Sequence, residues 1–237
     1  MKSIGLFNTI CFLLGCACLS SCVDYDEIEP FSGQTLPRKS GYSTGVTNDW
    51  IYFNLRTGEV FNAYRVNGDI KEGDQTDRTD WDLAFCGYVM RTNSGTSGIG
   101  QGAAADLGYG EYDKWTSVSQ LPSNLEWTVD NREVDVTMSQ NDWNHYLVEN
   151  NLDFNTNPWF DPNSGPAKTK TSANPVLSKA MSFAGPPPVY TPSFHTYVVR
   201  TADGLRYYKL QIISWYDANV EIGDEGGRIS YYCDELK

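Results

Sequence analysis

Histidine, methionine and positive charge are scarce in this chain of 237 residues. It holds two histidines, four methionines and 18 lysines and arginines, against 30 aspartates and glutamates. The net charge of -12 and the isoelectric point near 4.5 mean that a nucleic-acid backbone or an anionic membrane surface would repel the protein. Nucleic acid is therefore excluded as a partner, and a site that needs several imidazoles has few to draw on.

Long hydrophobic runs are missing after Cys22. Before it, Lys2 is followed by the apolar stretch "IGLFNTICFLLGCACL" and by "LSSC". Residues 1–21 are therefore predicted to be a lipoprotein signal peptide, because the ending resembles a bacterial lipobox whose cysteine, here Cys22, receives the lipid. An ordinary secretory signal cut nearby is the alternative. The mature chain is expected to be anchored to the membrane by lipid, since no later stretch approaches the length of a membrane span.

The segment after Cys22 is acidic and polar. It begins "VDYDEIEP", which resembles the surface-export signal of lipoproteins in the Bacteroides group and indicates the outer membrane and the cell surface. Prolines and glycines continue to residue 48, so residues 22–48 are predicted to be a lipidated flexible stalk. Residues 49–237 are then predicted to form one β domain.

The sequence gives little support for a disulfide or for a zinc site. Four of the six cysteines belong to the leader or to lipid attachment, namely Cys11, Cys16, Cys18 and Cys22. Cys86 and Cys233 could pair in an oxidising location, but both lie in apolar strand patterns where buried free thiols are common, and both alternatives stay open. No CxxC or Cys/His cluster exists, which argues against a structural zinc site.

Alternation of apolar and polar residues dominates from residue 50 onwards and predicts an all-β fold of predominantly antiparallel sheets. Hairpins are expected in "WIYFNLRTGEVFNAYRV" and in "FHTYVVRTADGLRYYKLQII", where Asp203-Gly204 suits a tight turn. "SQNDWNHYLVENNL" has helical spacing after the N-cap Ser139, so at most one or two short helices are expected. "DPNSGPAKTKTSANP" and "FAGPPPVYTP" are predicted to be long loops.

No pattern indicates a catalytic centre. "GIGQGA" superficially matches a dinucleotide-binding fingerprint, but Gly108 and Gly110 would break the helix that must follow it. His145 and His195 are the only possible bases for a serine triad, and "PSFHTY" has no nucleophile elbow. His195 is read as a partly buried strand residue with one hydrogen bond. The protein is therefore predicted not to be an enzyme.

Several segments resemble the HmuY family of haem-binding lipoproteins of Porphyromonas, Bacteroides and their relatives. They are "DWDLAF", "RTN", "SGTSGIGQGAA", "YVVRTADG" and "YYKLQI", and the likeness extends over roughly residues 50 to 237. The resemblance implies an all-β, surface-anchored protein for iron acquisition, which captures haem as cargo and delivers it to a TonB-dependent outer-membrane transporter. It also implies that the glycine-rich segment is a scaffold turn.

The resemblance places one axial haem ligand after the central hairpin and the other just before a proline-bearing loop. The first location corresponds to "MSQNDWNHYL", which makes His145 the leading candidate and Met138 its substitute. The second corresponds to "SKAMSFAGPPPVY", which has no histidine and leaves Met181. No metal other than the haem iron is expected. The pocket walls are expected from four neighbouring aromatic residues: Trp143, Tyr146, Phe183 and Tyr190. Ordinary packing is the alternative for each of these residues.

The missing second histidine motivates a different function. A thioether is a weaker ligand for ferric iron than imidazole, so a histidine-methionine pair should favour reduced haem. The alternative is a relative of the same fold that does not bind haem. It would serve as a binding or structural subunit for another porphyrin, for a glycan or for a surface complex.

Overall fold

Antiparallel strands are the predominant regular element of the structure, a computed structural model. It describes residues 30–41, 49–64, 70–185, 189–219 and 226–237. The chain divides into two compact units, Met1–Phe31 and Ser32–Lys237, and every element named below belongs to the second. The predicted all-β class is confirmed: within the described ranges there is a single α-helix, α2 (Gln140–Glu149), beside fifteen strands. No helix in those ranges is long and apolar enough to cross a membrane.

The larger sheet has five antiparallel strands in the order β1-β15-β14-β13-β6. Their bounds are β1 Gln34–Thr35, β6 Ala103–Tyr109, β13 His195–Arg200, β14 Tyr207–Ser214 and β15 Ser230–Glu235. The predicted hairpin β13–β14 is confirmed, with Tyr197 opposite Leu210. Gly204 has a φ of 76° in its turn, a conformation that glycine adopts without steric cost.

The smaller sheet has four strands in the order β3-β2-β4-β5. Their bounds are β2 Ile51–Asn54, β3 Glu59–Phe61, β4 Leu83–Cys86 and β5 Val89–Thr92. The predicted β2–β3 hairpin is confirmed. The segment "DWDLAFCGYV" is not one strand, because the chain reverses after Cys86 and returns as β5. Gly87 has a φ of 56° and permits this turn.

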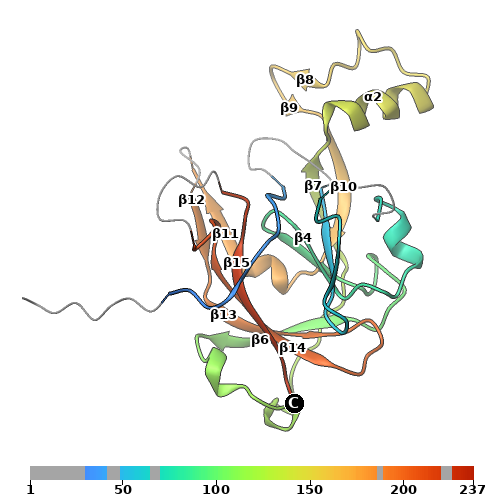
Figure 1. Ribbon diagram of the computed structural model, residues 1–237. Coiled ribbons are helices and arrows are strands. Elements are labelled where there is room, and N and C mark those ends of the chain that lie inside the picture. The colour runs from blue at the N-terminus through green and yellow to red at the C-terminus, as the bar shows by residue number, and fades with distance from the viewer. Residues whose placement is uncertain (1–29, 42–48, 65–69, 186–188, 220–225) are drawn as a thin grey trace, which may run out of the picture. The chain divides into compact units, whose positions relative to one another are not determined.

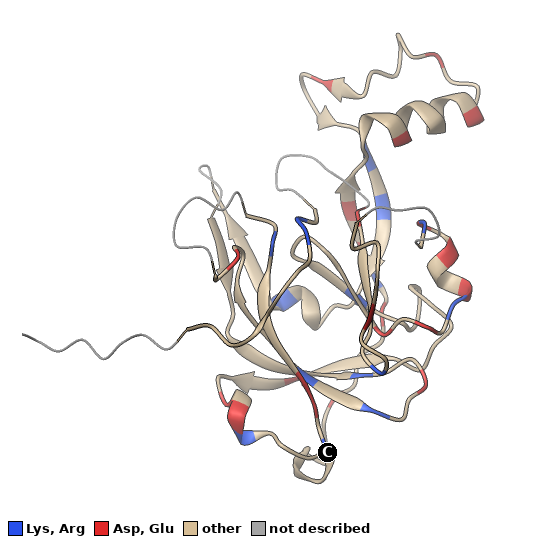
Figure 2. Ribbon diagram, viewed as in Figure 1, with Lys and Arg blue, Asp and Glu red and all other residues tan. Residues whose placement is uncertain are grey.

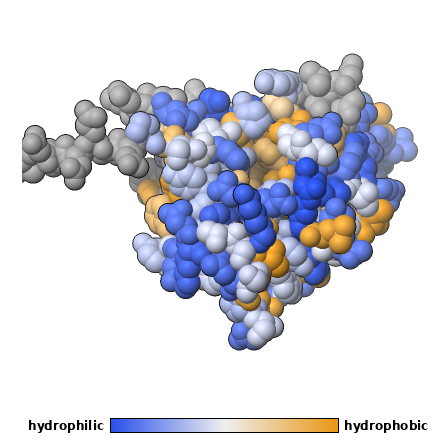
Figure 3. Space-filling model, turned by 60° about the horizontal axis from the view of Figure 1, so that its bottom comes forward, coloured by the Kyte–Doolittle hydropathy of each residue, from blue (hydrophilic) through white to orange (hydrophobic). Residues whose placement is uncertain are grey.

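The main core lies between the two sheets. Side chains from the smaller sheet and from the larger sheet belong to one buried cluster, which includes Ile51, Leu83, Phe85, Met90, Tyr197, Val199, Leu210 and Ile212. Alternation places these residues on the inner faces, where burying apolar side chains provides the largest stabilising contribution. On the face seen in Figure 3, apolar residues occur as separate patches among hydrophilic ones, one of them in a hollow.

A long hairpin, here called the arm, comprises residues 132–173. Its strands β7 (Arg132–Thr137) and β10 (Lys168–Ala173) pair with each other, and α2, β8 (Phe160–Asp161) and β9 (Gly165–Pro166) lie between them in sequence. Figure 1 shows α2, β8 and β9 at the far end of the arm. Ser139 caps α2 as predicted, since its hydroxyl accepts a hydrogen bond from Asp142 N–H.

A short hairpin, residues 181–192, stands apart from the arm in Figure 1. It consists of β11 (Met181–Ala184) and β12 (Val189–Pro192). Both segments predicted as long loops therefore contain strands. The prediction failed because Pro166 and Pro192 lie at strand ends, where a missing N–H is tolerated, while alternating threonines build β10. Four 3₁₀ turns complete the described elements: η1 Asp74–Asp77, η2 Tyr112–Lys114, η3 Val118–Gln120 and η4 Leu177–Lys179.

The domain begins earlier than residue 49. β1 pairs with β15, Leu36 is fully buried in the main core, and Arg38 forms an ion pair with Asp49 at 2.8 Å. The predicted stalk, 22–48, is therefore too long at its C-terminal end, because a polar composition does not prevent a short segment from completing a sheet edge. Cys22 and the signal peptide lie outside the described residues.

The glycine-rich segment surrounds the buried side chain of Asn93. Gly100 N–H donates to its amide oxygen at 3.0 Å, and Gly102 N–H donates to its backbone oxygen at 2.9 Å. A Cβ on Gly98 would lie 2.2 Å from that amide oxygen. These glycines permit the close approach of two backbone segments, so they serve packing in this structure.

Both remaining cysteines are buried thiols that form no disulfide with each other. Cys86 and Cys233 belong to different buried clusters, and burial raises the pKa of each thiol to about 12. Neither is poised as a thiolate at neutral pH. Over the described part of the chain, no group of three or more histidine, cysteine or acidic side chains could hold a metal ion.

Candidate functional site

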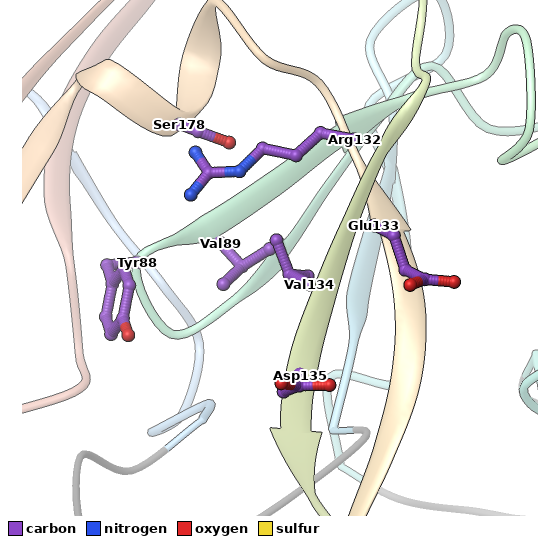
Figure 4. Close-up of a pocket in the computed structure, with 7 residues that line it drawn as sticks. All are labelled: Tyr88, Val89, Arg132, Glu133, Val134, Asp135 and Ser178. Atoms are coloured by element: carbon purple, nitrogen blue, oxygen red, sulfur yellow. The ribbon is translucent and has the colours of Figure 1, made fainter.

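A pocket of about 290 Å³ opens where strand β7 of the arm lies beside β5 and the 3₁₀ turn η4. It is lined from three elements: the β4–β5 turn, strand β7 and the 3₁₀ turn η4. The lining residues, shown in Figure 4, are Tyr88, Val89, Arg132, Glu133, Val134, Asp135 and Ser178. The pocket combines an aromatic ring, two valines, one guanidinium, two carboxylates and a hydroxyl, so apolar groups and charges of both signs meet in it.

Side chains of β7 point alternately to its two faces, and this decides which of them face the interior of the pocket. Figure 4 shows Arg132 and Val134 on the side of β7 that faces Val89 and Ser178, whereas Glu133 points away from them. Glu133 forms an ion pair with Lys170, its neighbour on β10. One face of the strand therefore presents the cation and the apolar group to the pocket.

The arm beyond this pocket is acidic. Figure 2 shows Asp and Glu but no Lys or Arg on α2 and on the segment that leads to β8. The only titratable base on α2 is His145, and that helix carries Asp142 and Glu149. The cations of the arm, Arg132, Lys168 and Lys170, therefore lie on β7 and β10 rather than at its far end.

Aromatic rings connect the β4–β5 turn to the short hairpin. Tyr190 stacks on Trp215 with ring centroids 4.1 Å apart, and its ring lies 5.2 Å from Phe183 and 5.7 Å from Tyr88. The sequence prediction included Tyr190 and Phe183 but missed Tyr88 and Trp215. Neither missed residue is close in sequence to the predicted ligands, and only the fold brings them beside the hairpin.

A buried network of hydrogen bonds around Asp130 attaches the base of the arm to β5. The carboxylate of Asp130 accepts hydrogen bonds from Thr92 N–H at 2.9 Å, from the Thr92 hydroxyl at 2.6 Å and from the Asn174 amide at 2.9 Å. Asn174 follows β10 and Asp130 precedes β7, so the pair joins both strands of the arm to β5. All three residues are fully buried.

Asp130 gives the stability of the protein a specific pH dependence. Burial raises its pKa from 3.8 to about 6, although hydrogen bonds oppose this shift. The native state therefore binds the proton more tightly than the unfolded state. This contribution is fully present below pH 4 and is lost as the pH rises through 6, an expected loss of about 3 kcal/mol.

In Asp130→Asn this loss should disappear. Between pH 4 and pH 7, urea unfolding should therefore show wild type losing about 2.5 kcal/mol of stability relative to the variant. Asp135→Asn, at an exposed position on β7, is the matched control. Parallel pH profiles for wild type and Asp130→Asn would show that the Asp130 pKa is not raised.

The predicted residues of the first ligand segment lie on the arm. His145 is exposed on α2, and Trp143 and Tyr146 stack on the same helix with centroids 5.2 Å apart. Met138 follows β7, where its N–H extends the ladder by donating to Ala167 O at 2.9 Å. Because side chains alternate, Met138 continues the face of Arg132 and Val134.

The predicted residues of the second segment lie on the short hairpin. Met181 is 4 % exposed and belongs to the main core, whereas Phe183 is exposed beside Tyr190. The structure thus brings together Trp143 with Tyr146 and Phe183 with Tyr190. It does not bring His145 to Met181, since α2 and β11 lie on separate hairpins (Figure 1). None of the seven predicted residues lines the pocket at the base of the arm.

Comparison with known proteins bears on the fold and the family. The family profile described as HmuY protein matches residues 46–233. The structure is similar to the apo HmuY analog TFO of Tannerella forsythia, with a TM-score of 0.50 and 18 % identity over 90 % of this chain and 100 % of that chain. It is also similar to apo PinO from Porphyromonas gingivitis, with a TM-score of 0.50 and 16 % identity over 87 % and 99 %.

A further structure, described as a candidate HmuY-like heme binding protein from Bacteroides vulgatus, has a TM-score of 0.47 and 18 % identity over 77 % of this chain and 82 % of that chain. No curated protein matches the chain. The profile match covers most of the domain, and the antiparallel sheets with one short helix agree with it. On this evidence the chain is a member of the HmuY family.

Proposed function

We propose that this protein is a cell-surface lipoprotein that binds haem between the arm and the short hairpin and passes it to an outer-membrane transporter. Membership of the HmuY family is the observation that carries the proposal. The pocket at the base of the arm supports it, because Tyr88, Val89 and Val134 offer an apolar slot beside a cation. The chain would transfer a ligand and catalyse no reaction.

The size of the pocket indicates how haem would enter. Its 290 Å³ lies at the lower end of the roughly 300–1,000 Å³ of small-molecule sites, so it would accept one edge of the porphyrin. The rest of the ring would lie between the arm and the aromatic group of Phe183, Tyr190 and Trp215. Closure of the arm on the hairpin would complete the site.

The axial ligands of this proposal are His145 and Met181, with Met138 as the substitute. His145 is exposed and free to turn toward a ligand, whereas Met181 would have to leave the main core. Met138 needs no such rearrangement, since it continues the pocket face of β7. Imidazole with thioether ligation would bind reduced haem more tightly than oxidised haem.

Titration with hemin, in both oxidation states, tests the function and its ligands. Wild-type protein at micromolar concentration should shift the Soret band. His145→Ala and Met181→Leu should each change that band and weaken binding by about tenfold, while leaving stability nearly unchanged, because leucine fills the volume of methionine.

The controls are the other histidine and a core methionine. His195 is held by the Asp106 carboxylate at 3.0 Å, and Met90 is fully buried, so His195→Ala and Met90→Leu should leave the spectrum unchanged. Free-hemin absorbance in the presence of wild type would end the haem proposal. Loss of the band in His195→Ala alone, or in Met138→Leu rather than Met181→Leu, would reassign the ligands.

A further inference from the structure

We propose that Arg132 selects the ligand of this site, by binding a carboxylate on the edge of a flat apolar molecule. The inference rests on the proposed function and extends it, since it names the chemical group that the protein recognises. Arg132 is the first residue of β7, and Figure 4 shows its guanidinium extending along the pocket toward Ser178.

Arg132 differs from the other arginines in the described ranges by having no partner there. Each of the others makes at least one hydrogen bond or ion pair, namely Arg38, Arg56, Arg78, Arg91, Arg200, Arg206 and Arg228. Arg132 is exposed, so its guanidinium is solvated by water and accessible to a ligand. The adjacent Glu133 points away and pairs with Lys170.

The neighbours of Arg132 leave it as the anion-binding group of the pocket. Arg132 is the only cationic residue in the pocket lining, which also includes two carboxylates, Asp135 and the Lys170-paired Glu133. The Ser178 hydroxyl already donates to Asn174 O at 2.7 Å. Lys179, the next residue, lines a different pocket together with Asp106 and Glu126.

The apolar side of the pocket fixes the class of ligand. Val89, Val134 and the ring of Tyr88 face the same space as the guanidinium. A free inorganic anion would make no favourable contact with the valines and the tyrosine ring, and a wholly apolar molecule would make no hydrogen bond to the guanidinium. A planar molecule with a carboxylate at its edge satisfies both, because guanidinium binds carboxylate through two parallel hydrogen bonds. The propionates of a porphyrin have this chemistry.

Porphyrins with free and with esterified propionates test the inference. We would measure binding of haem, of metal-free protoporphyrin and of the dimethyl ester of each. Wild type should bind each free acid at least about tenfold more tightly than its ester. Arg132→Gln should weaken binding of the free acids by about tenfold, leave the esters unchanged and so remove the discrimination. Arg206→Gln, which removes an exposed arginine outside the pocket, is the matched control and should retain it.

The metal-free porphyrins separate this inference from the haem proposal. One outcome is that Arg132→Gln loses binding of protoporphyrin but not of its ester, while haem shows no axial ligation in wild type. This outcome would support the role of Arg132 and overturn the proposed axial ligands. Haem binding that is equally strong in Arg132→Gln, or an equal loss for acid and ester, would overturn the role of Arg132. Absence of binding for all four compounds would overturn both.

Discussion

Replacing Asp82 with alanine is expected to lower the free energy of unfolding by about 4 kcal/mol. Its fully buried carboxylate accepts hydrogen bonds from Ala202 N–H at 2.7 Å and Leu55 N–H at 2.8 Å, and it pairs with Arg56 at 3.2 Å. Alanine would leave two backbone donors without an acceptor and would remove one of the partners of Arg56, which retains Thr79 O and Asp203. Because Leu55 follows β2 and Ala202 lies in the β13–β14 turn, this side chain connects the two sheets.

The matched control for Asp82 lies two residues earlier. Asp80 pairs with Arg78 at 2.6 Å, but its side chain is 48 % exposed, so Asp80→Ala should cost less than about 1 kcal/mol. Urea unfolding followed by tryptophan fluorescence measures both variants. An equal effect of the two substitutions would mean that Asp82 does not connect the sheets in the way described.

Replacing Arg91 with alanine should have a similar effect, a loss of about 4 kcal/mol. Arg91 is fully buried, its guanidinium lies 3.7 Å from the ring centroid of Trp50, and it bonds Glu72 at 2.9 Å. It also donates to the hydroxyls of Tyr52 and of Thr171 on β10. Truncation would leave a cavity, remove a cation–π contact and detach β10 from β5 at the base of the arm.

Two further variants isolate the geometry of Arg91. Arg91→Lys keeps the charge but lacks the planar fork, so it should recover about half of the loss. Arg78 also contacts an aromatic ring and a carboxylate, Phe61 and Asp80, but at a more exposed position. Arg78→Ala should therefore cost less than about 1 kcal/mol. If Arg91→Ala is no more destabilised than Arg78→Ala, the buried arginine is not a structural requirement.

Structural contacts explain two of the sequence segments that resemble the family. In "DWDLAF" the buried Trp81 N–H donates to Gln75 O at 3.0 Å, and Asp82 connects the sheets. In "GIGQGA" the glycines pack against Asn93. In this chain both segments build the scaffold, whereas the side chains proposed to bind a ligand lie on the arm and the short hairpin.

The candidate site could be predicted from sequence only in part. Spacing placed Trp143, Tyr146 and His145 on one helix correctly, because helical periodicity and an N-cap are local signals. Arg132 carried no such signal, since an arginine at the start of a strand usually pairs with a nearby acid. Its lack of a partner depends on Glu133 forming an ion pair with Lys170, the residue opposite Asp135 on β10, and only the pairing of β7 with β10 establishes this.

The sequence by itself determined the fold class, the helix at residues 140–149, the hairpins β2–β3 and β13–β14, and the family. These features rest on side-chain direction and on turn residues, which act over a few positions. Only the tertiary structure decided that residues 34–36 complete the domain, that β10 is a strand, and that a pocket forms between β5, β7 and η4. The reason is that strand partners and facing surfaces are chosen by burial across long stretches of chain, which no local pattern contains.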